Sequence, residues 1–473
     1  MTEVNMYQFS QRFKITTFVL MGLGLLGLAY GFLSAPSTVE EAKAIVAAHA
    51  ADGHSDAHGA TSDHGNVAHE SVAHDEHGTA EHQSDDTHAA EESHHEAATV
   101  AEDHHAEHDQ HVFDQMRNRP WSAFYVSALF AFLIALGVLA FYAVNRAAQA
   151  GWSPLLFRVM EGITSYLIPG GIILFVFFVL SALHMNHLFV WMDPEVVAHD
   201  ELIQNKSGYL NSTFFLIRAA IFIGGWIFYQ QFSRKLSLAE ETATDTKSFV
   251  LNFRVSAGFL VFFLVTESIM SWDWIMSVDP HWFSTLFGWY VFASFFVSGI
   301  TTIALFTLYL KSKGLLEEVN NSHIHDLAKF MFGISIFWTY LWFSQFMLIW
   351  YADIPEEVTY YVMRFESYKV PFLGMLVLNF LFPLLVIMRS DYKRIPWFVQ
   401  TVGIIILTGH YLDFYNMIMP GTVGEHWSIG IPEIGGILFF AGLFLFVVAT
   451  ALTKVPVTPK GSPLLGESKH FHY

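Results

Sequence analysis

Ionisable residues inside long apolar segments are the part of this sequence most able to do chemistry. Arg218, Glu267, His410 and Asp413 each lie within a run of hydrophobic residues. Such residues are costly in a membrane, so they usually face a bundle interior or a water-filled cavity and pair with another polar group. We therefore expect Glu267 and the His410/Asp413 pair to line a hydrated polar pathway or pocket.

Two kinds of chemistry use these residue types. A quinol headgroup needs a hydrogen-bond acceptor at each hydroxyl and a route by which two protons leave. A proton pathway needs carboxyl and imidazole groups at hydrogen-bonding intervals, and the residues alone do not separate the two uses. The candidates for either use are His184, Arg218, Glu267, Asp273, His281, Asp353, His410 and Asp413.

Some of these candidates also have ordinary structural explanations. His184 and His187 are three residues apart and share a helical face, as do His410 and Asp413, but His184 could equally be a packing histidine. Polar residues near helix ends cost little in free energy. Arg218 is the expected counter-ion of Glu267 or of Asp273, and that pairing could be purely architectural.

Ten apolar segments, each long enough to cross a hydrocarbon core of ~30 Å, must position these side chains. They lie near residues 15–33, 121–143, 164–190, 212–231, 250–272, 284–310, 329–351, 370–388, 396–418 and 433–452. The first could be a signal peptide, but Leu33-Ser34-Ala35-Pro36 is a poor cleavage site, so we interpret the segment as an anchor. The sequence thus predicts an all-α, multi-pass membrane protein.

The distribution of Lys and Arg predicts the orientation in the membrane. With the N-terminus in the cytoplasm, 17 of the 24 basic residues lie on the inner side, six on the outer side and Arg218 within a segment. Both termini are therefore expected in the cytoplasm. The expected divisions are an anchor at 1–34, an outer loop at 35–119, a membrane core at 120–418, and a last helix with a cytoplasmic tail at 419–473.

Composition narrows the function classes. The 473 residues are 53% hydrophobic and 14% charged, which excludes a soluble protein with a single core. The chain has no cysteine, so a disulfide, a thiolate metal site and a cysteine-attached haem or iron–sulfur cluster are excluded. Only His184 and His410 are plausible haem ligands within the segments. We expect no tightly bound redox centre and no nucleic-acid partner.

Residues 41–111 account for most of the net charge of −19. They contain 17 Asp and Glu against one Lys, together with 15 of the 25 His. Because this stretch has almost no large apolar residues with which to form a core, we expect a disordered outer loop that acts as a solvated tether. The alternative is a loop that holds Zn²⁺ or Cu²⁺ loosely.

A weak internal repeat indicates two tandem units. Pro280 follows Asp273, and Pro420 follows Asp413, by seven residues in each case. The third and seventh segments also end alike, at Trp191-Met-Asp-Pro-Glu195 and Trp350-Tyr-Ala-Asp-Ile-Pro-Glu356. Because the members of each pair are four segments apart, we predict two four-helix bundles, with the first and tenth segments outside them.

A resemblance to a known family rests on the fifth segment. Glu267-Ser-Ile-Met-Ser-Trp-Asp-Trp274, followed by Asp279-Pro-His-Trp-Phe-Ser-Thr-Leu-Phe287, resembles the NrfD-like quinone-interacting membrane subunits, in particular those of bacterial alternative complex III. Residues 181–187, 342–353 and 409–413 resemble the second, ActF-type subunit more than the ActC type. The resemblance covers segments two to ten and implies ten helices in two four-helix bundles.

The resemblance also implies a function and partners. Such a chain would be a cofactor-free subunit of a quinol:cytochrome c (or quinol:oxidase) oxidoreductase in a bacterial inner membrane, with menaquinol or quinone as the candidate substrate. Its partners would be a second NrfD-like subunit, an iron–sulfur protein, multihaem and monohaem cytochromes c that carry haem c, and small membrane subunits, with a terminal oxidase as a further candidate. Because the ActC-type subunit would hold the main quinol site, the resemblance implies that Glu267, Asp273, His410 and Asp413 line a proton route or a vestigial quinone pocket.

Two other functions fit the same residues. One is a transporter of a divalent metal with the His-rich loop as a collector, although His410 and Asp413 have no matching pair on another segment. The other is a purely structural subunit that fills space between its neighbours.

Overall fold

The computed structural model describes residues 6–53 and 89–472, and within these ranges it is helical, with no strand. As the sequence predicts, ten helical segments are long and apolar enough to cross a membrane. The segments are α1 (Gln11–Ser34), α3 (Ala89–Ala147) from Val112 onward, η1–α4–α5 (Pro154–Ala182), α8 (Ser212–Ala239), α9–η3–η4 (Lys247–Val278), α10 (Phe287–Ser312), α11 (Asn321–Ala352), α13–η5–α14 (Lys369–Ile387), α15 (Pro396–Val423) and α16 (Ile431–Leu452). The chain is thus a multi-pass membrane protein.

The chain divides into two compact units. Residues 1–34 and 118–473 form the first unit, and residues 35–117 form the second. The second unit contains α2 (Val39–Gly53) and the first part of α3, and Lys43 and Asp109 form an ion pair of 2.6 Å within it.

The outer loop, expected to be disordered, is therefore helical at both of its ends. Alanine and glutamate, which favour helix strongly, are frequent in α2 and at the start of α3, and that is the physical reason for the difference. Residues 54–88, with eight of the tract's 15 histidines, lie outside the described residues. The proposed tether and the alternative metal site both involve this stretch, and both stay predictions.

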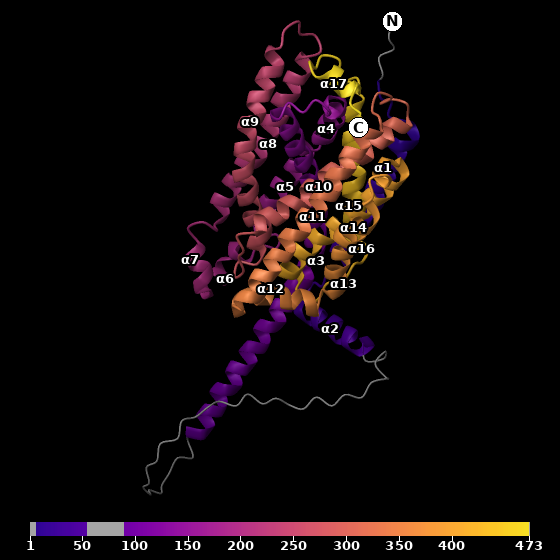
Figure 1. Ribbon diagram of the computed structural model, residues 1–473. Helices are drawn as coiled ribbons and strands as arrows, with labels where there is room; N and C mark the ends of the chain where they lie inside the picture. The colour runs from indigo at the N-terminus through magenta and orange to yellow at the C-terminus, as the bar shows by residue number, and fades with distance from the viewer. Residues whose placement is uncertain (1–5, 54–88, 473) are drawn as a thin grey trace. The chain divides into compact units, whose positions relative to one another are not determined.

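The long helices of the first unit run side by side (Figure 1). The short helix α17 (Leu465–Lys469) lies beside α4 (Phe157–Thr164) at one end of this bundle. The helices α6 (Pro194–His199), α7 (Glu201–Lys206) and α12 (Pro355–Glu366) lie at the other end. These are called the α17 end and the α12 end below.

The helices pack in two groups, with a pair of flanking helices. In one group α8 packs between α5 and α9, and in the other α10 packs against α11 and α15, while α13 packs on α15. The flanking helix α1 packs along α16. A Cβ on Gly435 would lie 2.8 Å from the backbone carbon of Gly27, so glycine is required for this close approach.

The centre of the unit is formed by α3 and α10, the two most buried of the ten segments. They cross at Gly137 and Gly299, where a Cβ on Gly299 would lie 2.7 Å from the backbone nitrogen of Val138. Tyr125 on α3 donates a hydrogen bond to the carbonyl of Trp274 (2.7 Å), and Ser127 on α3 is 3.1 Å from the hydroxyl of Tyr411. The segments that carry Asp273 and Asp413 therefore both contact the same central helix.

Candidate functional site

Asp273 forms a closed ion pair with Arg218. The α-helix α9 ends at Met270 and continues as a π-helical turn, η3 (Ser271–Ile275), which carries Asp273. The Arg218 guanidinium from α8 meets the carboxylate with two contacts, Nε to Oδ2 at 2.5 Å and Nη2 to Oδ1 at 3.0 Å. Of the two expected partners of Arg218, the structure places Asp273 there and not Glu267.

Aromatic side chains complete this ion pair. The Tyr209 hydroxyl donates to Asp273 Oδ1 at 2.7 Å, and its ring lies under the Arg218 guanidinium at 4.0 Å. Arg218 Nη1 also donates to the Tyr209 carbonyl at 3.1 Å. Burial and the charge of Asp273 raise the pKa of Tyr209, so its hydroxyl remains a donor. A bidentate pair in such surroundings is fixed in one geometry.

Asp413 occupies a different environment in the other helix group. It is fully buried, and its oxygens accept hydrogen bonds from Tyr290, from Ser294 Oγ (2.7 Å) and from Trp338 Nε1 (2.8 Å). These donors come from α10 and α11 and carry no charge. Among the described residues, the only basic side chain within ion-pair distance is His410, whose Nδ1 lies 3.6 Å from Oδ2.

His410 is connected to Asp413 through Ser294. The Ser294 hydroxyl lies 2.9 Å from His410 Nδ1 and donates its one hydrogen to Asp413. That hydroxyl can accept from the ring when Nδ1 of neutral His410 carries the proton. His410 Nε2 is buried without a hydrogen-bond partner in the part of the chain that the structure describes. Asn379 from the π-helical turn η5 (Val377–Leu381) lies 3.4 Å from Nδ1.

Glu267 is a buried carboxyl held only by its own helix. Its oxygens are 3.3 Å from the hydroxyls of Ser268 and Ser271, which donate to it. Within the described residues no Arg, Lys or His forms an ion pair with it. Glu267 thus has no fixed charge beside it, in contrast to Asp273.

The remaining candidates lie apart from these clusters. His184 is exposed just beyond the end of α5, with a left-handed φ of 56°. His281 Nε2 lies 2.6 Å from Asp200 Oδ2. Asp353 ends α11 in the left-handed conformation, with φ of 49°. The structure therefore brings together Arg218 with Asp273 and His410 with Asp413, and it leaves the other candidates separate.

Two cavities lie near the α12 end of the first unit. The larger has a volume of about 570 Å³ and is bounded by η4 (Met276–Val278), α12 and α15, with Asp279 and Asp353 in its lining. The smaller, of about 10 Å³, has Tyr290 and Arg364 in its wall and is large enough for about one water. Asp413 and His410 line neither cavity.

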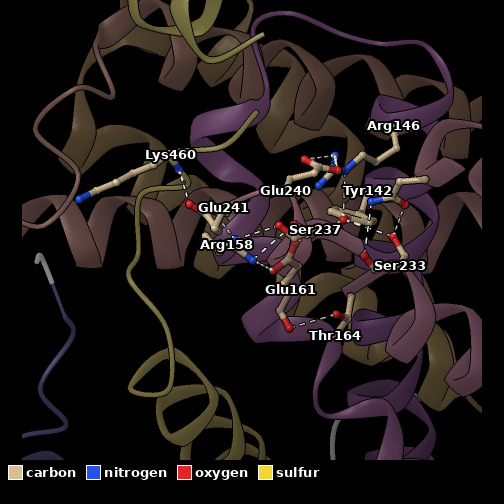
Figure 2. Close-up of polar contacts among 11 residues, drawn as sticks. Tyr142, Arg146, Arg158, Glu161, Thr164, Ser233, Ser237, Glu240, Glu241 and Lys460 are labelled. Carbon is tan, nitrogen blue, oxygen red and sulfur yellow. Dashed lines mark hydrogen bonds and ion pairs between the residues drawn. The ribbon is translucent and has the colours of Figure 1, made fainter. Parts of the chain in front are cut away.

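A second polar cluster, at the α17 end, was not among the sequence candidates. Figure 2 shows Arg146 paired with Glu240 (2.9 Å), and Arg158 paired with both Glu161 (2.6 Å) and Glu241 (2.5 Å). All except Glu241 are almost fully buried. The backbone N–H of Lys460 donates to Glu241 at 2.9 Å, which ties the C-terminal tail to the cluster.

The arginines of this cluster lie near the ends of membrane segments, where basic residues are common in membrane proteins. In the sequence, Arg146 and Arg158 count only toward the charge asymmetry. The three-residue spacing of Arg158 and Glu161 is the signal from which one pair was predictable. Tyr142, which accepts from Arg146 at 3.1 Å and donates to Glu161 at 3.3 Å, links the two arginine pairs (Figure 2). The cluster holds three helix ends together by charge-assisted hydrogen bonds.

No protein-family model matches this chain, and no curated protein matches it in sequence at a significant level. Within the described residues, no three His, Cys, Asp or Glu side chains gather closely enough to hold a metal ion. A functional assignment therefore depends on the geometry of the chain's own residues.

Proposed function

We propose that the chain is an integral membrane subunit of a quinol-oxidising respiratory complex, that it holds no redox centre of its own, and that it contributes a buried proton relay around Asp413. The observation that carries the relay is the continuous contact from Tyr290 through Asp413 and Ser294 to His410, in the interior of a helical bundle. The resemblance of the fifth segment to NrfD-like subunits supports the respiratory complex.

The partners of Asp413 suit a group that gains and loses a proton. A carboxylate held by a buried arginine cannot be protonated without leaving that charge unpaired, which is strongly unfavourable. Asp413 has only neutral donors and an imidazole beside it, so neither protonation state breaks an ion pair with a fixed charge. A hydroxyl such as Ser294 can accept from one neighbour while it donates to the other, and it can pass a proton between them.

Quinone binding is a separate question, because a quinol needs space as well as acceptors. Neither of the two cavities described above is lined by Glu267, His410 or Asp413. The contacts that support a proton route are those of His410 and Asp413 with Ser294. In the proposed complex, electrons from quinol would pass to haem c and iron–sulfur clusters of partner subunits.

The first experiment is purification of the tagged chain from native membranes in mild detergent, with a visible spectrum and identification of the proteins that accompany it. We expect c-type haem, an iron–sulfur protein and a second ten-helix subunit in stoichiometric amounts. A colourless protein that purifies alone would overturn the proposal and favour a transporter.

The relay is tested in the same preparation with Asp413→Asn. The amide keeps the shape of the side chain but does not exchange a proton at physiological pH, so we expect an assembled, coloured complex whose proton translocation is at least tenfold lower. Asp391→Asn, the same chemical change at an exposed position, is the matched control. Unchanged translocation in Asp413→Asn would leave the purely structural function.

A further inference from the structure

Arg364 differs from the other buried arginines of the described chain. Arg146, Arg158 and Arg218 each form an ion pair with a carboxylate, whereas Arg364, with 4% of its surface exposed, forms none among the described residues. Its guanidinium lies over the Tyr360 ring and donates to two backbone carbonyls, those of Tyr360 (2.7 Å) and Asn416 (3.1 Å). A buried cation without a counter-ion is strongly unfavourable unless an anion comes from outside the chain.

Arg364 lines the cavity of about 570 Å³ at the α12 end. Most of the wall is apolar, with Val278, Phe287, Val358 and Met417 among its residues, and Trp282 stacks on Tyr360 at 3.9 Å beside them. Val278 is the last residue of the fifth membrane segment, and Met417 lies six residues before the end of the ninth. The cavity thus lies where two of the candidate membrane segments end, which is where lipid headgroups are expected.

Carboxylates also line this cavity, and they are more exposed than the arginine. Asp353, Glu366 and Glu425 are exposed, Asp279 is partly exposed, and all four belong to the lining. Within the described residues none of the four forms an ion pair. Along the chain, Arg364 contacts the helix at Asn416, whereas Glu425 follows nine residues later, beyond the end of α15. The cation therefore lies at the buried floor of the cavity and the anions at its mouth.

We propose that this cavity binds the phosphate–ammonium headgroup of a zwitterionic phospholipid, with the phosphate on Arg364, the ammonium among the carboxylates, and the adjoining glycerol and acyl carbons against the apolar wall. A free anion would match the arginine but would be repelled by the carboxylates, and a free cation would match only the mouth. In a bilayer leaflet the phosphate lies deeper than the ammonium, and the charges of the cavity follow the same order.

The test uses the full chain, delipidated in a neutral maltoside detergent, with thermal unfolding followed by tryptophan fluorescence. Short-chain dihexanoyl phosphatidylethanolamine is titrated beside dihexanoyl phosphatidylglycerol, inorganic phosphate and ethanolamine. We expect a saturable rise in Tm with the ethanolamine lipid. With the glycerol lipid, the concentration that gives half of this rise should be at least tenfold higher. Phosphate or ethanolamine alone should give no rise. An equal rise with inorganic phosphate would identify a free-phosphate site and overturn the proposal, as would equal binding of the two lipids.

Two variants and a control keep the test decisive. Arg364→Gln should abolish the lipid-dependent rise, because it removes the cation that is proposed to hold the phosphate. Glu425→Gln combined with Glu366→Gln should retain binding but remove the preference for the ethanolamine lipid. The control is Lys369→Gln, which removes a positive charge at an exposed residue outside the cavity lining. A full response in Arg364→Gln would overturn the assignment, and if that variant does not fold, the double glutamate variant still decides it through the lipid preference.

Discussion

The sequence pattern predicts that Asp273 and Asp413 correspond, and in the structure their surroundings differ in charge. Asp273 meets the Arg218 guanidinium with two hydrogen bonds, whereas Asp413 meets Tyr290, Ser294 and Trp338, none of which is charged. The carboxylate is thus paired with a fixed charge in one group and with neutral donors in the other. This difference is what separates a structural ion pair from a candidate relay.

The two aspartates have different partners because the segment that precedes each of them carries a different polar side chain. In the first group this segment is α8, which supplies Arg218; in the second, the preceding segment supplies Asn379 from η5, close to His410. Asparagine can donate and accept hydrogen bonds but cannot compensate a charge. The preceding segment thus supplies a charge to the aspartate in the first group and only a neutral amide near His410 in the second.

The largest expected effect comes from removing the fixed anion. Asp273→Asn leaves Arg218 buried without a counter-ion, so the free energy of unfolding in mild detergent should fall by about 3–5 kcal/mol. Asp413→Asn leaves a hydrogen-bonding group of the same size beside neutral donors, so the loss should be roughly 1–2 kcal/mol. Chemical denaturation of the two variants against the native chain measures both values.

A double variant sharpens this comparison. Asp273→Asn combined with Arg218→Met removes both charges, so it should recover at least half of the stability that Asp273→Asn alone loses. Equal losses in Asp273→Asn and Asp413→Asn would contradict the distinction between the two aspartates, whatever the double variant shows.

A smaller effect is expected at the tyrosine of the Asp413 cluster. Tyr290→Phe removes one donor from a buried carboxyl that keeps its bonds from Ser294 and Trp338, so the free energy of unfolding should fall by about 1.5–3 kcal/mol if Asp413 is charged and by about 1 kcal/mol if it is protonated. The matched control is Tyr340→Phe, which removes the same atom from a side chain that is 64% exposed. A loss that equals that of Tyr340→Phe would contradict the contact between Tyr290 and Asp413.

The loops that follow the third and seventh segments also differ, although both contain an aspartate before a proline. Asp193 is the N-cap of α6 and accepts from the backbone N–H of Glu195 at 3.0 Å, whereas Asp353 ends α11 with a left-handed φ of 49°. Asp193→Ala should therefore lower the free energy of unfolding by about 1 kcal/mol. Asp353→Gly should leave it unchanged or raise it by less than about 1 kcal/mol, since glycine adopts a left-handed φ readily.

Thermal unfolding of these two loop variants, measured side by side, decides between opposite signs. A comparable loss in both would mean that the two aspartates have equivalent roles, as the similar ends of the two segments in the sequence suggest. That outcome would restore the simple repeat and contradict the structural distinction.

The fold was largely predictable because membrane segments are recognisable by their length and hydropathy. All ten segments appear, and α1 and α16 pack as a pair outside the two helix groups. The helical ends of the acidic loop do not follow from its lack of core-forming residues, because local helix propensity depends on alanine and glutamate instead. Membrane orientation and both cytoplasmic termini stay predictions.

The site was predictable from the sequence only where an ionisable residue interrupts an apolar segment. Arg218 and Asp413 are conspicuous in apolar segments, and their involvement in polar clusters followed from that. Tyr290, Ser294 and Trp338 are ordinary residues of membrane helices, so only packing shows that they meet Asp413. Arg364 belongs to a short helix between segments, and its lack of a counter-ion is a property of the fold alone.

The smallest expected effect concerns a cap at the α12 end that the second group lacks. Asp200 caps α7 by accepting from the Ile203 N–H at 3.0 Å and contacts His281 Nε2 at 2.6 Å, whereas Ile354 at the start of α12 makes no side-chain cap.

The backbone hydrogen bond from Ile203, and then His281, lowers the pKa of Asp200. A carboxyl whose pKa is lower in the folded state stabilises that state above the ordinary pKa of aspartate, about 3.9, and loses this contribution as the pH falls through the lower value. The Tm difference between the native chain and Asp200→Asn should therefore shrink as the pH falls below about pH 4, while that of the exposed control Asp391→Asn should stay near zero throughout. A difference that persists undiminished at pH 2 would show that the Asp200 cap does not depend on its charge, and the two groups would then differ at this end only in shape.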